Sequence, residues 1–197
     1  MPLRPGRAPG LIAASVTSSM PNHVAFLRGI NLGPRRRIDG AELRSLFEEM
    51  GFGDVDSFRA SGNVVFDSAR KPVAARIEKG LEESKGFEVT VFLRAASEVR
   101  AMAAYEPFDG ELVEASNGKL QVAMLPAKPA ARACKDVLAL ATDEDRLAFG
   151  DRELYWLPSG GMRDSALNLN AIEKLLGPWT MRTKGTIEQM AAKYFAG

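Results

Sequence analysis

The apolar residues of this chain repeat at two spacings, and each spacing predicts a different kind of element. Between residues 43 and 50, apolar side chains recur at i, i+3, i+4 and i+7, which is the spacing of one buried face of a helix. Between residues 87 and 94 they alternate with Phe87 and Leu93 on the same face, which is typical of a strand. Segments of the two kinds follow one another in the same order twice along the chain.

The first half of the chain predicts the order β-α-β-β-α-β. Strands are expected at 23–27, 55–59, 63–66 and 87–94, and helices along 40–50 and 72–85. Asp39 and Glu42 have the spacing of a capping box at the start of the first helix. Ser61-Gly62 suits the turn between the two middle strands, because glycine adopts a positive φ without cost.

The same order returns in the second half. Strands are expected at 120–124, 146–149, 154–157 and 179–183, and helices along 130–141 and 165–176. A short helix at 97–104 and a linker or long loop at 105–118 separate the two sets. We expect Ser165 or Asp164 to cap the second of these helices, and Thr186 with Gln189 to cap a terminal helix.

This order predicts an α+β protein of two tandem ferredoxin-like βαββαβ units with antiparallel sheets, plus a C-terminal helix. The first unit would span 21–104 and the second 119–197, with 105–118 as the linker. Right-handed crossovers would place both helices of a unit on one face of its sheet. The pattern alone leaves open whether the two sheets pack together.

The first twenty residues do not fit this scheme. Arg4 and Arg7 precede a short apolar run at 11–16, which is at the lower limit of what a signal peptide requires. We interpret 1–20 as a disordered extension or as a misassigned start, with translation beginning at Met20. A weak secretory signal is the alternative interpretation.

Composition and charge exclude several classes of protein. The 197 residues are 46% hydrophobic and 26% charged, as in ordinary globular proteins, and the net charge of +1 gives no general attraction to nucleic acid or to an anionic membrane. No apolar stretch approaches the roughly 20 residues of a membrane-spanning helix. The single cysteine, Cys134, excludes an intrachain disulfide and fits a reducing compartment, so we expect a cytoplasmic protein.

No catalytic set can be named from the sequence, and whether the protein is an enzyme stays open. His23 is the only histidine, and Cys134 is expected on a buried helix face, so neither suggests nucleophilic catalysis. A metal site built from several cysteine or histidine ligands is excluded, and no P-loop or G-x-G-x-x-G string occurs. The sequence therefore indicates no cofactor and no metal.

Three stretches resemble one bacterial family. They are Val24–Asn31 (VAFLRGIN), 41–52 and Ser61–Phe66 (SGNVVF). On these strings the chain is similar to the family catalogued as domain of unknown function 1697, from about residue 22 to the C-terminus. The resemblance implies a duplicated pair of intertwined ferredoxin-like units, and it implies no established activity, substrate or cofactor. Its beginning just after Met20 favours the late start.

The chain departs from that family near its C-terminus. The family usually carries a Thr-Thr-Arg-Asn-Trp-x-Thr run before its last helix. Thr180, Arg182 and Thr186 match this run, whereas Thr183 and Lys184 replace the Asn and the Trp. If the run builds a site in the family, we expect that site to be altered or lost here.

Basic loops that lead into helices are the best candidates for a binding site, because helix N-termini favour anions. The first is the loop 28–37, the second precedes the helix at 165–176, and the third precedes the terminal helix. The candidate ligand-binding residues are Arg28, Gly29, Asn31, Arg35, Arg36, Arg37, Arg163, Ser165, Arg182 and Lys184. The alternative for all three is structural: solvated basic loops, with Arg28 in an ion pair and ordinary helix capping.

Three hypotheses about function follow, in order of preference. The first is binding of a small phosphorylated or otherwise anionic ligand at the basic loops. The second is nucleic-acid binding, against which the net charge counts, and for which Tyr155, Trp156 and Trp179 could stack bases, although core packing is the better interpretation. The third is a structural or protein-interaction role without a ligand, for instance as a homodimer.

Overall fold

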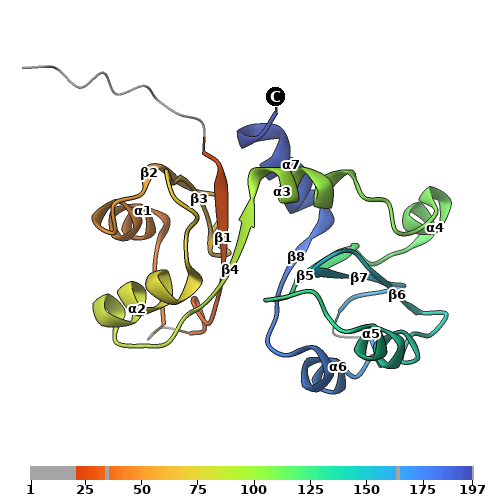
Figure 1. Cartoon of the computed structure of the whole chain (residues 1–197). Coiled ribbons are helices and arrows are strands. Elements are labelled where there is room, and N and C mark those ends of the chain that lie inside the picture. The colour runs from red at the N-terminus through yellow and green to blue at the C-terminus, as the bar shows by residue number, and fades with distance from the viewer. Residues whose placement is uncertain (1–20, 34–35, 163–164, 197) are drawn as a thin grey trace, which may run out of the picture.

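The computed structural model describes residues 21–33, 36–162 and 165–196 (Figure 1). The first unit contains two helices and one four-stranded antiparallel sheet in the order β2-β3-β1-β4. Its elements are β1 (His23–Arg28), α1 (Gly40–Glu49), β2 (Gly53–Ser57), β3 (Asn63–Asp67), α2 (Ala74–Lys85) and β4 (Thr90–Ala95).

The second unit repeats this arrangement with the strand order β6-β7-β5-β8. Its elements are β5 (Gln121–Met124), α5 (Ala131–Leu138), β6 (Asp145–Phe149), β7 (Glu153–Pro158), α6 (Leu169–Leu176) and β8 (Thr180–Thr183). Three further helices are α3 (Ala96–Ala104), α4 (Gly110–Ala115) and α7 (Lys184–Tyr194). The predicted α+β fold, with a duplicated unit and a C-terminal helix, is confirmed.

Three local predictions need correction. The stretch 105–118, predicted as a linker or long loop, contains the helix α4. Helix α6 begins at Leu169 and is capped by Asn168, whose side chain accepts a hydrogen bond from the Ala171 N–H at 2.9 Å, so Ser165 does not cap it. Asp164 lies outside the described residues.

The cap of α7 also differs from the prediction. Thr183, not Thr186, is the N-cap, and its hydroxyl accepts from the Thr186 N–H at 3.3 Å. The helix starts early because β8 continues into it without a loop. The cap of α1 is as predicted, since the Asp39 side chain accepts from the Glu42 N–H at 2.9 Å.

Each sheet has one face covered by its own helices. In the first unit, Ala25 and Leu27 of β1 face a core that α1 and α2 complete. In the second unit, Ala123 and Trp156 belong to the corresponding core under α5 and α6. Both cores follow from the period-2 alternation of the strands and the apolar faces of the helices.

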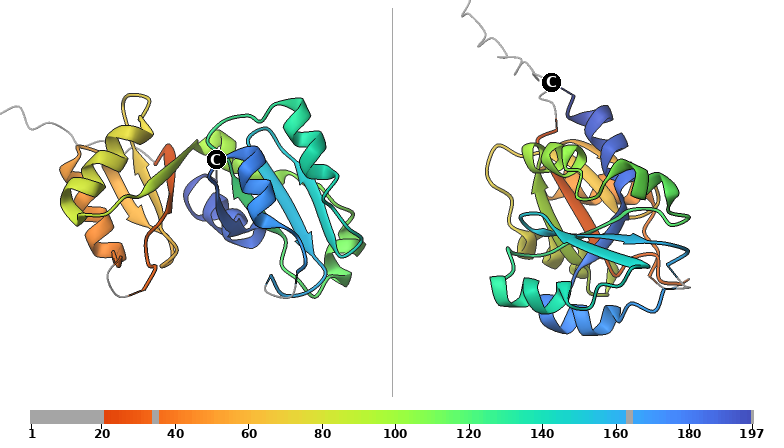
Figure 2. Two further views of the ribbon diagram at one scale, coloured as in Figure 1. Left: turned by 90° about the horizontal axis from the view of Figure 1, so that it is seen from below. Right: turned by 90° about the vertical axis from the view of Figure 1, so that its right-hand side faces the viewer.

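The opposite faces of the two sheets contribute to a third core between the units. Val24 and Phe26 of the first sheet and Val122 and Met124 of the second belong to one buried cluster. Helices α3 and α7, each of which directly follows the last strand of a unit, pack together and belong to the same cluster (Figures 1 and 2). The two units are therefore joined by a continuous hydrophobic layer.

The two halves correspond residue by residue at this layer. Arg94 of β4 pairs in register with Val24, and Arg182 of β8 pairs with Val122. Each arginine thus occupies the same place in the last strand of its unit. This register identifies equivalent positions in the two halves.

Candidate functional site

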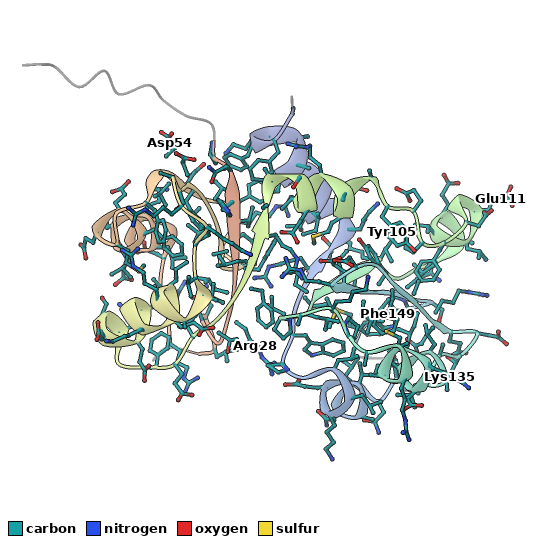
Figure 3. The ribbon with its side chains drawn as sticks, viewed as in Figure 1. Arg28, Asp54, Tyr105, Glu111, Lys135 and Phe149 are labelled. Atoms are coloured by element: carbon teal, nitrogen blue, oxygen red, sulfur yellow. The ribbon has the colours of Figure 1, made fainter. Side chains whose placement is uncertain are left out.

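The predicted site residue Arg28 lies at the end of β1 and contacts the other unit. Its Nη2 lies 2.8 Å from Glu173 Oε1 of α6, and each side chain is a little over one third exposed. Its Nη1 is shielded from solvent and has no hydrogen-bond partner among the described residues. Figure 3 shows Arg28 between the units. Arg28 therefore forms an ion pair, as the structural interpretation of this loop expected.

Gly29 and Asn31 shape the backbone that follows. Gly29 has a φ of +93°, and a Cβ at this position would lie 3.2 Å from the Glu88 carbonyl oxygen. Asn31 has a φ of +57°. Its Nδ2 donates to the Ala60 carbonyl at 2.8 Å, and its Oδ1 accepts from the Ile38 N–H at 3.3 Å. Asn31 thereby links the β2–β3 connection to the start of α1.

A cavity of about 550 Å³ opens at this junction. Its lining comes from the segment before and into α1 and from the β2–β3 connection: Asn31, Gly33, Arg37, Ile38, Asp39, Gly40, Leu43, Arg59, Ala60 and Gly62. We call it the α1 cavity. Two arginines from separate segments, Arg37 and Arg59, line it, and the first turn of α1 forms part of its wall.

The other basic residues of this loop differ in their surroundings. Arg37 is exposed, and within the described part of the chain no hydrogen bond or ion pair holds it. The Arg36 guanidinium lies 5.7 Å from the centre of the Phe87 ring. Arg35 lies outside the described residues. Arg59, which the sequence did not single out, donates from Nη2 to Gln189 of α7.

The second predicted loop supplies no cationic site among the described residues, since Arg163 lies outside them. The Ser165 hydroxyl donates to Asp145 Oδ1 at 2.8 Å and accepts from the Leu167 N–H at 3.0 Å. Asp145 Oδ1 also accepts from Trp156 Nε1 at 2.7 Å. Ser165 therefore joins a hydrogen-bonded group with Asp145, the first residue of β6, and Trp156.

The third predicted loop carries two basic side chains that are buried. Arg182 is 9% exposed, and its Nε donates to Asn63 Oδ1 at 2.6 Å while its Nη2 donates to the carbonyls of Leu27 and Gly62 at 3.1 and 3.3 Å. Burial lowers the pKa of Arg182 to about 10, so it stays charged at neutral pH. Its donors connect β8 to the first unit.

Lys184 is likewise engaged within the protein. It is 4% exposed, and its Nζ lies 2.9 Å from Glu106 Oε1 and 3.0 Å from Glu188 Oε1. The three predicted loops therefore differ in availability. Among the residues that the structure describes in these loops, Arg37 of the first loop is the exposed arginine that lines a cavity.

The sequence pattern did not single out Arg94, which is a buried charged residue. It is 1% exposed, and its Nε lies 2.8 Å from Glu153 Oε1. Its Nη2 donates to the carbonyls of Leu125 and Arg152 at 3.0 and 2.9 Å. Arg94 thus reaches into the second unit as Arg182 reaches into the first, and the equivalent position of the two arginines was the signal available in the sequence.

Other sequence predictions can be compared with the structure. Tyr155, Trp156 and Trp179 are buried, which confirms core packing for all three. Cys134 is only partly buried, contrary to the expected buried face. Across residues 21–33, 36–162 and 165–196, no group of three or more His, Cys, Asp or Glu side chains could hold a metal, and no helix could span a membrane.

These features define a duplicated α+β protein whose halves meet at a hydrophobic layer that includes two buried arginines, Arg94 and Arg182. The sequence profile of the family described as protein of unknown function (DUF1697) matches residues 20–155, which is more than half of the chain. The protein belongs to this family, as the sequence motifs indicated. A search of curated proteins found no match.

Among solved structures, the chain is similar to the conserved bacterial protein SP0830 from Streptococcus pneumoniae. The TM-score is 0.67 at 19% sequence identity, and the alignment covers 88% of this chain and 98% of that one. At this identity the similarity shows the fold alone.

Proposed function

We propose that this protein binds a small ligand with a phosphate or another compact anionic group in the α1 cavity. The observation that carries the proposal is the pair Arg37 and Arg59, which line one cavity at the start of a ten-residue helix. Guanidinium groups form charge-assisted, often bidentate, hydrogen bonds with phosphates and carboxylates. A site with two of them favours an anion over a neutral ligand.

The start of α1 adds to this attraction. The first N–H groups of a helix have no acceptor within the helix, and the helix dipole places partial positive charge there. Gly40, the first residue of α1, lines the cavity, so the start of the helix forms part of the wall. Asp39 also lines the cavity, but its Oδ1 accepts from the Glu42 N–H. The charged lining residues together are net positive.

The shape of the lining indicates the rest of the ligand. Ile38 and Leu43 give the cavity an apolar wall, and about 550 Å³ is within the range of small-molecule sites. A sugar phosphate or a mononucleotide suits such a site better than inorganic phosphate alone. Asn31 and Arg59, with φ of +57° and +61°, both line the cavity, and left-handed non-glycine residues are enriched at functional sites.

A thermal-shift screen against sugar phosphates, mononucleotides and inorganic phosphate tests the proposal. A ligand at 100 times its Kd adds about 2.7 kcal/mol, which raises the unfolding midpoint of a chain this size by roughly 5–10 °C. The shift should be lost in Arg37→Ala and in Arg59→Ala. Arg132→Ala is the matched control, because Arg132 is 93% exposed on α5. Full shifts in both cavity variants would contradict the proposal.

Nucleic-acid binding has less support. Arg28, Arg182 and Lys184 have partners within the protein, and the aromatic side chains proposed to stack bases are buried. A nucleic-acid binder would show affinity that falls steeply with salt. A gel shift at low salt that persists in the Arg37→Ala and Arg59→Ala variants would favour this second function over the first.

A further inference from the structure

A second cavity, of about 420 Å³, lies between α3 and the β6–β7 connection. It is lined by Glu98, Ala101, Met102, Tyr105, Phe149, Gly150, Asp151, Glu153 and Tyr155. We call it the α3 cavity. Every charged residue that lines it is acidic, whereas the α1 cavity is lined by two arginines. The two cavities therefore favour ligands of opposite charge.

Aromatic rings form much of the wall. The ring centres of Tyr105 and Tyr155 lie 5.1 Å apart at an angle of 67°, and the Tyr105 hydroxyl donates to the Phe149 carbonyl at 3.3 Å. Figure 3 labels Tyr105 at the end of α3 and Phe149 at the end of β6. Tyr105 is 41% exposed, so a ligand can reach it. Aromatic faces attract organic cations.

Two carboxylates of the α3 cavity, Glu98 and Asp151, have a lowered pKa. Burial alone would raise the pKa of Glu98, but hydrogen bonds from the Ala95 N–H and from Arg152 outweigh it and lower that pKa. A hydrogen bond from Lys128 lowers the pKa of Asp151. Glu153 pairs with the buried Arg94. Each carboxylate thus has a basic partner, but these partners do not line the cavity, so the charged groups on its wall are all acidic.

At the corresponding place beside α7, a lysine side chain lies against aromatic rings. The segment β4–α3 corresponds to β8–α7, because Arg94 and Arg182 occupy equivalent positions. Tyr105 and Lys193 follow these two arginines by the same number of residues, so they are equivalent as well. The Lys193 Nζ is 4.4 Å from the centre of the Tyr194 ring and 5.9 Å from that of Phe58. On α7 the chain itself therefore supplies an ammonium against aromatic rings.

A carboxylate completes that cluster. Lys193 Nζ lies 3.3 Å from Asp56 Oδ2, and Asp56 lies in β2, the strand of the β2–β3 hairpin that leads to Phe58. Rings, an ammonium and a carboxylate thus meet where α7 contacts the first unit. The α3 cavity offers rings and carboxylates at the equivalent contact, but none of the residues that line it carries an ammonium or guanidinium.

The β2–β3 and β6–β7 hairpins differ in the side chain that each presents at this contact. The Phe58 N–H donates to the Asn63 carbonyl at 2.8 Å, and the Gly150 N–H donates to the Glu153 carbonyl at 2.9 Å, so these residues occupy equivalent positions in the two hairpins. Asn63 and Glu153 themselves pair with Phe26 and Met124 at matching points of β1 and β5. Glycine at 150 lacks the ring that Phe58 supplies, and a Cβ there would lie only 3.1 Å from Tyr155 Cε2 and 3.2 Å from Glu153 Oε2.

We infer that the α3 cavity binds a small organic cation, namely an amine or quaternary ammonium attached to an apolar body. The ammonium would lie against the Tyr105 ring and near the Asp151 and Glu98 carboxylates. The apolar body would contact Met102 and Phe149. This site is separate from the α1 cavity and does not depend on the function proposed there.

Calorimetric titrations with three compounds that share one skeleton test this inference. They are 2-phenylethylamine, 2-phenylethanol and phenylacetate, which carry positive, zero and negative charge at neutral pH. The amine should bind saturably and at least about threefold more tightly than the alcohol, and phenylacetate should bind least. Equal affinity for the amine and the alcohol, or no saturable binding of the amine, would overturn the inference.

Variants locate the binding. Tyr105→Ala and Asp151→Asn should each weaken amine binding about twofold to fivefold. Glu111→Gln is the matched control for lost charge, because Glu111 lies on α4 and does not line the cavity. Ala101→Trp should block binding with both tyrosines intact, since Ala101 is exposed and lines the cavity. Unchanged amine affinity in the folded Ala101→Trp variant would place the ligand elsewhere.

Discussion

Replacing Arg182 with methionine should weaken the contact between the two units. Methionine has nearly the length of the arginine stem but none of its donors. The change leaves Asn63 Oδ1 and the carbonyls of Leu27 and Gly62 without the donors that now lie 2.6, 3.1 and 3.3 Å away. All three hydrogen bonds join β8 to the first unit, so the loss falls on the interface.

The size of the effect can be estimated from two opposing contributions. Asn63 Oδ1 loses its donor, which costs about 1–3 kcal/mol, while the Gly62 and Leu27 carbonyls keep the Leu27 N–H and the Thr180 hydroxyl but each lose a hydrogen bond from a charged group, about 1.5–3 kcal/mol; the total is roughly 4–9 kcal/mol. Removing the buried charge returns about 3 kcal/mol, because burial has lowered the pKa of Arg182 from its ordinary value to about 10. The expected net loss of unfolding free energy is therefore about 3 kcal/mol, which lowers the midpoint by roughly 6–12 °C.

Two spectroscopic signals follow this change during denaturant unfolding. Trp156 and Trp179 both lie in the core of the second unit, so tryptophan fluorescence reports that unit, whereas far-UV circular dichroism reports both. In the unaltered protein the two transitions should coincide, and in Arg182→Met they should separate. Arg132→Met, an exposed control, should change the stability by less than about 0.5 kcal/mol. A loss below about 1 kcal/mol in Arg182→Met would refute the structural role of Arg182.

Three further predictions concern protonation and backbone strain. His23, the only histidine, should titrate below pH 6.5 by NMR, because burial lowers its pKa. Its contribution to the free energy of unfolding should be fully present above pH 6.5 and should be lost as the pH falls through the lowered pKa. Glu98 has a lowered pKa, so its stabilisation should be lost as the pH falls below about 4.5, and Glu98→Gln should reduce this acid dependence in urea titrations. Gly62→Ala should lower the free energy of unfolding by about 2–4 kcal/mol, and Gly33→Ala should lower it by about 1 kcal/mol. Both glycines have a positive φ, but of the two only a Cβ at 62 would meet side chains, at 2.7 Å. Equal losses in the two variants would contradict this reasoning.

The sequence predicted the strands and most of the helices because their apolar residues keep a regular spacing. It did not predict α4, because the helix Gly110–Ala115 has no buried residue and hence no apolar face to repeat. The cap at Thr183 was missed because Thr186 and Gln189 have the spacing of a capping box, while the helix starts directly at the end of β8. Local patterns therefore located elements better than their ends.

The candidate site was only partly predictable, because its members depend on contacts between distant segments. The loop before α1 was identified correctly as basic and as leading into a helix. The contact of Arg182 with Asn63, 119 residues away, follows from how the two units pack, and the cavity shared by Arg37 and Arg59 follows from how the β2–β3 connection packs beside α1 within the first unit. The spacing of apolar residues within one segment does not predict contacts between distant segments.

The most direct test of the proposed function is an amide NMR titration with glucose 6-phosphate. The account predicts saturable shifts at the N–H groups of residues 38–40, 59, 60 and 62, which line the α1 cavity, and no saturable shifts there with glucose. These shifts should be absent in Arg37→Ala. Equal shifts with both compounds, or phosphate-dependent shifts confined to residues outside this cavity, would contradict an anion-binding site at the start of α1.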